Sequence, residues 1–406
     1  MNLELKKNVY WVGSLDPDLK VFDIIMYTKF GTTYNSYCIK GSEKTALIET
    51  VKVKFFDEYV DRLKKITKIE DIDYIVVNHT EPDHAGSIEK LLKLNPDITV
   101  IGSRSAIDFL KHICNMEFKY EEVRHNDKIS LGDKTLKFID AKFLHWPDSM
   151  YTYLEEDKIL FSCDSFGAHY SLDTVLQSTI KNYDDYLEAF AYYYSMILSP
   201  FKTYFLDAIE KIESLPIDMV CPGHGPILDS DPWEIINLSK KYSVINKPNS
   251  DKTVVIPYVS AYGYTEKLAD SIKKGIEEQG ITAELFDLQT AQKSKVMEAI
   301  NRADGVLFGS PTILGEALKP IWDVLTDMYS AIHKGKIASA FGSYGWSGEA
   351  VPDIMQRLKQ LKMKTFKDGF RIRFKPSEEQ LKMACDFVKE FGNAVKTGNT
   401  DIGGVK

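Results

Sequence analysis

The sequence contains few cysteines and no closely spaced pair of them. Its five cysteines are spread over 406 residues, and no CxxC pattern occurs. This argues against a disulfide framework, a zinc site built from thiolates and a fused iron–sulfur or rubredoxin module. A reducing, cytoplasmic setting is therefore expected.

Long hydrophobic runs and concentrated positive charge are also missing. No stretch approaches ~18 uninterrupted apolar residues, so no membrane span is predicted, and the N-terminal residues lack the apolar core of a signal peptide. The formal net charge is −8, and no basic stripe of the kind that nucleic acid requires is present.

The composition is ordinary for a globular protein, with 44% hydrophobic and 27% charged residues. The length suits two domains. Acidic residues predominate before residue 250, whereas the remainder is nearly neutral. A polar segment that contains proline precedes an apolar strand near this point, so we predict domains at residues 1–249 and 250–406.

Strand and helix patterns alternate regularly in the second domain. Strands are expected at residues 253–259, 281–286, 305–308, 336–341 and 370–374. Helices are expected to begin near residues 266, 291, 318, 349 and 377, and the helix from residue 318 is expected to run to about residue 331. Alternation at this spacing predicts an α/β fold with a parallel sheet covered by helices on both faces. Five strands favour the flavodoxin-like variant.

Three loops, at residues 260–265, 310–315 and 342–348, lie at the expected carboxyl ends of these strands and have residues suited to ligand binding. The first combines hydroxyls with backbone N–H groups at a helix N-terminus, which form an anion cradle. The third is rich in glycine and carries two aromatic rings that can face a flat ligand. Neither a GxGxxG nor a GxxxxGK[ST] pattern occurs, which weakens the dinucleotide and P-loop interpretations.

At this point the segment resembles flavodoxin over nearly its whole length. The resemblance implies bound FMN, with its phosphate in the first loop and its isoalloxazine ring between the second and third. The implied cofactor-binding residues are Ser260, Ala261, Tyr262, Gly263, Tyr264, Thr265, Pro311, Thr312, Ile313, Gly315, Ser343, Tyr344, Gly345, Trp346 and Gly348.

The densest motif of the chain is His-Thr-Glu-Pro-Asp-His at residues 79–84, which follows an expected strand at residues 72–77. It places four possible metal ligands within six residues, on a loop where they can converge. His145, Asp164 and His224 stand in similar positions after other expected strands, at intervals of 61, 19 and 60 residues from His84 onward.

This order and spacing resemble the metallo-β-lactamase fold, in which helices enclose two β-sheets as an αββα sandwich and a binuclear site lies at one edge. The usual hydrolase signature is His-x-His-x-Asp-His, and Glu81 replaces its second histidine here. Imidazole suits zinc, whereas added carboxylates favour a harder, redox-active metal such as iron. The implied metal ligands are His79, Glu81, Asp83, His84, His145, Asp164 and His224.

A metallo-β-lactamase-like domain with this glutamate, followed by flavodoxin, resembles the flavodiiron protein family. The resemblance implies a non-haem diiron centre that is supplied with electrons by FMN and reduces dioxygen to water, nitric oxide to nitrous oxide, or both. In some members the residue that matches His84 is not bound. The implied division is His79, Glu81 and His145 on one iron, Asp83, His84 and His224 on the other, and Asp164 bridging them.

The resemblance also implies partners. In the family, a head-to-tail homodimer, or a dimer of such dimers, brings the FMN of one chain to the diiron site of the other. The absence of CxxC pairs points to an external electron donor. A separate rubredoxin is expected, and a reduced deazaflavin is the alternative. The ligand set does not distinguish O₂ from NO.

Two further residues are candidates for a catalytic role, and several histidines are not. His169 is expected to orient or donate to a bound ligand. Tyr194 lies in a run of three tyrosines, for which aromatic core packing is the favoured interpretation. His112, His125 and His333 lie among charged or helical residues and are expected to be structural.

Other functions compete with the diiron interpretation. One is a zinc-dependent hydrolase with an attached flavodoxin domain, against which Glu81 and the flavin loops argue. Another is an electron carrier with a degenerate metal site, which the complete ligand set disfavours. A flavin-dependent reductase acting directly on a nicotinamide lacks a dinucleotide signature.

Overall fold

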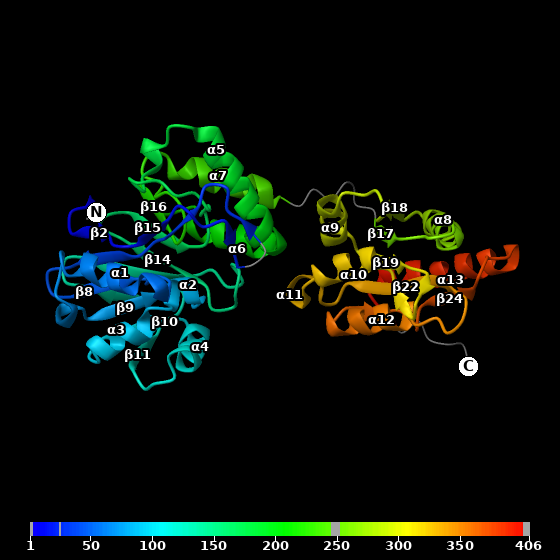
Figure 1. Cartoon of the computed structure of the whole chain (residues 1–406), viewed down its shortest axis with the longest axis horizontal. Coiled ribbons are helices and arrows are strands. Elements are labelled where there is room, and N and C mark those ends of the chain that lie inside the picture. Colours follow the sequence, from blue (N-terminus) through cyan, green and yellow to red (C-terminus); the bar gives the residue numbers. More distant parts are fainter. Residues whose placement is uncertain (1–2, 24–25, 245–251, 401–406) are drawn as a thin grey trace. The chain divides into compact units, whose positions relative to one another are not determined.

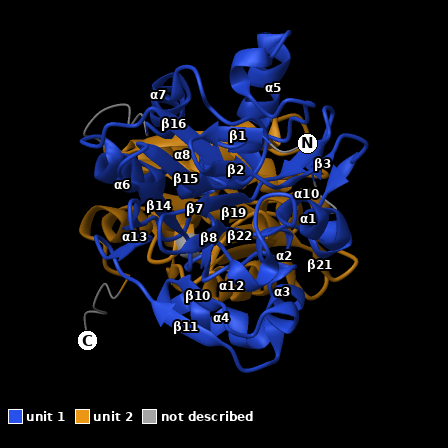
Figure 2. Cartoon of the chain, turned by 90° about the vertical axis from the view of Figure 1, so that its left-hand side faces the viewer, with its two compact units in different colours: residues 1–244 blue, residues 245–406 orange. Residues whose placement is uncertain are grey.

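The computed structural model describes residues 3–23, 26–244 and 252–400. The chain divides into two compact units, Met1–Val244 and Ile245–Lys406 (Figure 2). The domain boundary predicted between residues 249 and 250 lies outside the described residues. Among those residues, no helix has the length and apolar character needed to cross a membrane.

The first unit is a sandwich of two β-sheets with helices on both outer faces (Figure 1). One sheet has the order β1 (Leu3–Lys6), β2 (Val9–Trp11), β7 (Tyr37–Lys40), β8 (Thr45–Ile48), β9 (Tyr74–Val77), β10 (Thr99–Gly102) and β11 (Lys119–Glu122). The other has the order β12 (Lys128–Ser130), β13 (Thr135–Asp140), β14 (Met150–Leu154), β15 (Ile159–Cys163) and β16 (Met219–Pro222). Two small antiparallel pairs join β3 (Ser14–Asp16) to β6 (Thr32–Tyr34) and β4 (Val21–Phe22) to β5 (Met26–Tyr27).

Helices cover the sandwich on both sides, which confirms the predicted αββα architecture. One side carries α1 (Phe56–Leu63), α2 (Pro82–Ala85), α3 (Ile88–Leu94) and α4 (Arg104–Cys114), and the other carries α5 (Tyr183–Tyr193), α6 (Lys202–Ile212) and α7 (Pro232–Ser243) (Figure 1). Because successive side chains of a strand point to opposite faces of its sheet, β9 contributes residues to two hydrophobic cores. Val76 packs between the sheets, whereas Ile75 and Val77 face the helices.

The second unit is a parallel sheet with helices on both faces, as predicted. Its order is β18 (Thr282–Asp287), β17 (Thr253–Tyr258), β19 (Gly305–Gly309) and β22 (Ile337–Tyr344), followed by β23 (Lys364–Thr365) and β24 (Phe370–Arg373). β23 and β24 pair with successive parts of β22, so together they fill the fifth position of the sheet.

Amphipathic helices bury one face each against this sheet. One side carries α8 (Tyr264–Glu277) and α13 (Glu378–Thr397), and the other carries α9 (Lys293–Arg302), α10 (Lys319–Thr326) and α12 (Ala350–Gln360). The single helix predicted from residue 318 to about 331 is wrong. α10 ends at Thr326, and a separate short helix, α11, spans Ser330–His333.

Candidate metal centre

The seven predicted metal ligands meet at one edge of the first unit. His79 follows β9 of one sheet, whereas Asp164 directly follows β15 and His224 follows β16 of the other sheet. His145 lies in the connection between β13 and β14. Asp83 and His84 lie on α2, a single helical turn that begins with Pro82, so the motif is not purely a loop as expected.

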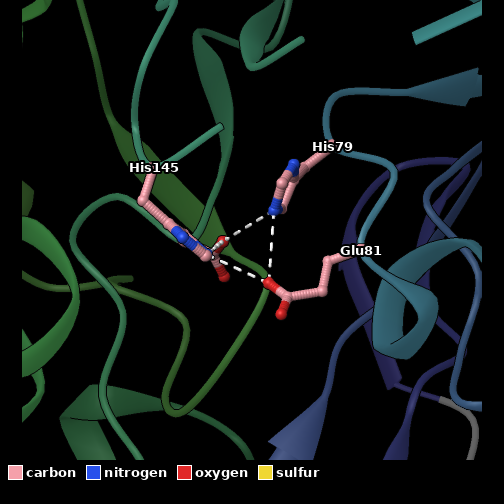
Figure 3. A group of neighbouring side chains, drawn as sticks. His79, Glu81 and His145 are labelled. Carbon is pink, nitrogen blue, oxygen red and sulfur yellow. Dashed lines mark hydrogen bonds and ion pairs between the residues drawn. The ribbon is translucent and has the colours of Figure 1, made fainter. Parts of the chain in front are cut away.

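The first group of side chains consists of His79, Glu81 and His145, which converge from two separate segments (Figure 3). Glu81 Oε2 lies 3.3 Å from His79 Nε2 and 3.0 Å from His145 Nε2. Asp164 Oδ2 completes the group, at 3.6 Å from His79 Nε2 and 3.4 Å from His145 Nε2. Candidate ligand atoms of all four residues lie within 4.8 Å of one another.

The second group consists of Asp83, His84 and His224. Asp83 Oδ2 lies 2.9 Å from His224 Nε2 and 3.5 Å from His84 Nε2. The other oxygen of Asp164, Oδ1, lies 3.1 Å from His84 Nε2 and 3.6 Å from His224 Nε2. Each oxygen of Asp164 therefore faces a different group.

The charges in this cluster depend on one another. Burial disfavours ionisation of Asp164, but the imidazoles of His84 and His145 outweigh it and hold the pKa of Asp164 well below its usual range. Burial likewise opposes protonation of His84, yet Asp83 and Asp164 raise its pKa to about 10. The carboxylates therefore favour positive charge at the centre of the cluster, which is what a divalent metal ion supplies.

Unpartnered polar atoms also fit a metal ion. Oδ1 of Asp83 is buried without a hydrogen-bond partner among the described residues, whereas Oδ2 of Asp83 and Oδ2 of Asp164 face imidazoles of the cluster itself. Buried carboxylates of this kind ordinarily pair or coordinate a metal. Gly223 leaves room for the second group, because a Cβ atom there would lie 2.6 Å from Cε1 of His84.

Two of the imidazoles are oriented by partners on their far side. Nδ1 of His79 lies 3.2 Å from Oδ2 of Asp148, which also accepts hydrogen bonds from the backbone N–H and the hydroxyl of Thr80, each at 2.8 Å. Nδ1 of His224 lies 2.6 Å from the carbonyl oxygen of Thr33. Such contacts fix the tautomer of a histidine and leave Nε2 free to bind metal.

The two residues predicted to have catalytic roles lie in different surroundings. The ring of His169 packs 5.1 Å from that of His224, and Thr32 Oγ1 lies 2.8 Å from its Nδ1, so His169 borders the cluster. The hydroxyl of Tyr194 instead contacts Ser243, at 2.7 Å. The neighbouring Tyr193 contacts the cluster, since its hydroxyl donates to Asp164 Oδ1 at 3.0 Å.

The predicted flavin loops lie at the carboxyl ends of neighbouring parallel strands in the second unit. The first loop joins β17 to α8, the second follows β19 as a small hairpin of β20 (Thr312–Ile313) and β21 (Glu316–Ala317), and the third follows β22. The hydroxyls of Thr265 and Ser343 lie 3.0 Å apart and link the first loop to the third. Thr312 Oγ1 accepts the N–H of Ala350 at 3.2 Å.

The first loop fits an anionic group such as the FMN phosphate. α8 begins after Gly263, which has φ +75° and provides no side-chain cap for the helix. Ser260 Oγ accepts the N–H of Glu266 at 3.3 Å. Other N–H groups of the first turn have no partner within the helix and are available to an anion.

Each of the three predicted flavin loops carries one large, exposed apolar side chain. Tyr262 is 78% exposed, Leu314 93% and Trp346 89%, and each belongs to a different one of the three loops. Exposed apolar groups that gather at a site are typical of a surface that binds a ligand or a protein.

The roles of Asp148, Thr33 and Tyr193 are not predicted by the sequence. Asp148 lies three residues after His145, and its carboxylate is the only sequence signal for its role. Thr33 acts through its backbone carbonyl, for which residue type gives no signal. Tyr193 and Tyr194 are adjacent, and only the helix geometry distinguishes them.

Two protein families match separate parts of the chain. Residues 32–225 match the family described as "ODP family beta lactamase", and residues 256–387 match "Flavodoxin". These matches cover the two sets of loops described above.

Individual proteins are similar over nearly the whole chain. "Flavo-diiron protein FprA2" of Clostridium acetobutylicum is 42% identical over 400 residues, which cover 97% of this chain and 99% of that protein. "Nitric oxide reductase" of Moorella thermoacetica is 37% identical over 385 residues, which cover 92% of this chain and 94% of that protein. Rubredoxin oxygen:oxidoreductase from Desulfovibrio gigas, a solved structure, is 27% identical with a TM-score of 0.66 over 98% of this chain and 99% of that chain.

Proposed function

This chain belongs to the flavodiiron protein family, and we propose that it reduces dioxygen to water, nitric oxide to nitrous oxide, or both. The observation that carries the proposal is the buried cluster of four histidines and three carboxylates, in which Asp164 faces two groups. Relatives named for nitric oxide reduction and for oxygen reduction support the same reaction class.

We propose that the cluster holds two irons. His79, Glu81 and His145 are assigned to one, Asp83, His84 and His224 to the other, and Asp164 to both. When bound, the irons and FMN together would supply the electrons for reduction of a small diatomic molecule, since FMN can accept one or two electrons and pass them on singly.

The chain's own residues orient this centre and restrict access to it. Asp148 and Thr33 hold the rings of His79 and His224, and Tyr193 donates a hydrogen bond to Asp164. The buried ring of Phe22 packs 5.3 Å from that of His224 and 4.3 Å from that of His169. This apolar ring favours a weakly polar diatomic molecule such as O₂ or NO over water.

FMN is assigned to the three loops of the flavodoxin unit. Residues 260–265 would bind the phosphate through hydroxyls and N–H groups at the start of α8. The aromatic rings of Tyr344 and Trp346 are suited to contact the isoalloxazine ring.

We also propose a head-to-tail homodimer, or a dimer of such dimers, in which the flavodoxin unit of one copy serves the metal centre of the other. The exposed apolar side chains around the flavin loops support a protein contact there. A test mixes two inactive variants, Asp164→Ala and a variant that cannot bind FMN. Heterodimers should regain gas consumption, whereas a fully active monomer by light scattering contradicts the proposal.

The proposed electron donor is a separate rubredoxin, with a reduced deazaflavin as the alternative. The similar protein from Desulfovibrio gigas is a rubredoxin oxygen:oxidoreductase, which supports rubredoxin as the donor here. Turnover with a charged protein donor should slow as ionic strength rises. We place the reaction in the cytoplasm, since all five cysteines are unpaired thiols.

The activity is tested by reducing the purified protein without oxygen and then supplying NO and O₂ separately. We expect rapid consumption of at least one gas, and the iron and flavin content of the same sample must be measured. Loss of consumption with retention of flavin colour is expected for His79→Ala. Two zinc ions per chain together with thioester or lactam hydrolysis would instead establish the hydrolase alternative.

A further inference from the structure

The turn that carries His224 is held by residues far earlier in the chain. Asn35, which immediately follows β6, donates from its side-chain Nδ2 to the carbonyl oxygens of Pro222 and Gly225, each at 2.9 Å. Its backbone N–H donates to the carbonyl oxygen of Gly223 at 2.8 Å. One residue therefore binds three carbonyl groups around His224.

Chemistry fixes the orientation of the Asn35 amide. The indole N–H of Trp11 can only donate, and it lies 2.9 Å from Asn35 Oδ1. The two carbonyl groups can only accept, so Nδ2 must face them. Asn35 is completely buried, and its amide has no other arrangement that satisfies all three partners.

The turn itself has little room to adjust. Gly225 has φ +78°, and a Cβ atom there would lie 2.3 Å from the carbonyl oxygen of Ala168. The hydroxyl of Tyr37 adds another hydrogen bond to the carbonyl oxygen of Pro222, at 2.7 Å. Together with Thr33, which contacts Nδ1 of His224, these bonds determine where Nε2 of His224 points.

We propose that Asn35 is a positioning residue for the metal centre, which holds His224 in place by bridging the two carbonyl groups on either side of it. The inference rests on the proposed function, because it requires His224 to bind iron. The inference goes beyond the proposed function because it assigns a role in iron retention to Asn35, whose hydrogen bonds to this turn go to backbone carbonyl groups.

Substitution by aspartate tests this bridge with almost no change in shape. In Asn35→Asp the two N–H donors are replaced by an oxygen that faces two carbonyl oxygens at hydrogen-bond distance. The turn must then move, or the new carboxyl must be protonated. Either result weakens the hold on His224.

Asn95 provides a matched control in the same unit. It is also buried, at 6% exposure, and its Nδ2 donates to two backbone carbonyl oxygens, Ile69 at 3.0 Å and Ile72 at 3.2 Å. It belongs to neither group of candidate ligands. Asn95→Asp therefore removes the same kind of bridge without affecting the turn of His224.

The measurement is the rate at which ferrous iron passes from the anaerobic holoprotein to a coloured ferrous chelator. For Asn35→Asp we expect one of the two irons to leave about 10 to 100 times faster than in the wild type, because partners behind a ligand typically affect metal affinity by that factor. The other iron and the release from Asn95→Asp should stay close to wild type.

A milder variant keeps the test valid if Asn35→Asp does not fold. Tyr37→Phe removes one hydrogen bond from the same turn and should speed release of one iron roughly threefold to tenfold. Unchanged release from folded Asn35→Asp, or equal acceleration in Asn95→Asp, would overturn the positioning role. A wild-type protein without iron would instead refute the proposed function, before any variant is compared.

Discussion

Replacing Asp148 by asparagine isolates the effect of one buried charge on the metal centre. Oδ2 of Asp148 accepts hydrogen bonds from Thr80 and lies 3.2 Å from Nδ1 of His79, whereas its Oδ1 is buried without a hydrogen-bond partner among the described residues. In the variant, the amide oxygen of the new side chain would have to occupy the Oδ2 position, because an NH₂ group there would face the N–H of Thr80. Asp148→Asn therefore keeps the geometry and removes the charge.

The expected loss follows from the role of the carboxylate. Burial by itself would raise the pKa of Asp148, but the contact with His79 and the hydrogen bonds from Thr80 hold it below its usual value. The ionised carboxylate thus strengthens His79 as a donor to metal. Its removal should weaken iron binding about 10- to 100-fold, or about 1.4 to 2.7 kcal/mol.

The assay is competition for ferrous iron between the protein and a chelator of known affinity, under anaerobic conditions. Asp229→Asn is the matched control. The carboxylate of Asp229 also accepts hydrogen bonds from the backbone N–H and the hydroxyl of one residue, Ser178, at 2.9 and 2.6 Å. Asp229 is partly exposed, however, and belongs to neither group of candidate ligands. Wild-type affinity in folded Asp148→Asn would refute the reasoning, as would an equal loss in Asp229→Asn.

Three further substitutions separate the parts of the molecule. Gly223→Ala should weaken iron binding at least about tenfold, since the new methyl group would displace the ring of His84, and iron analysis after dialysis measures this. Tyr193→Phe should retain two irons but slow gas consumption roughly threefold to tenfold, because Asp164 loses a hydrogen bond. Full gas consumption by this variant would contradict a role for the Tyr193 hydroxyl. Thr265→Val should raise the dissociation constant of FMN roughly threefold to tenfold, as measured by fluorescence titration, because the hydrogen bond between the first and third loops is lost. Its iron content should not change, and loss of iron would contradict the independence of the flavin and metal sites.

The grouping of the metal-site residues was predictable because strand ends share sheet edges. His79, Asp164 and His224 each follow a buried apolar strand, so the sequence places them at one side of a sandwich. The neighbouring positions of the three proposed flavin loops were predictable for the same reason, since carboxyl ends of parallel strands meet along one edge.

Residues that act through precise packing could not be read in this way. Tyr193 and Tyr194 have the same chemistry, but in the folded chain the hydroxyl of Tyr193 reaches Asp164 and that of Tyr194 reaches Ser243. Asn35 contacts carbonyl groups 187 and 190 positions away, and no local pattern reveals such a pairing.

A similar limit applies to the ends of helices. The apolar pattern after residue 318 continues to about residue 331, but the helix stops at Thr326 and resumes at Ser330. The intervening side chain of Met328 is buried in the core, so tertiary packing overrides the local helical pattern.

The most direct test of the diiron proposal is the metal and flavin content of the protein purified without oxygen. Elemental analysis and flavin absorbance on one sample should give two irons and one FMN per chain. Asp164→Ala should lose iron while keeping its FMN. Stoichiometric zinc in place of iron in the wild-type protein would contradict the proposal.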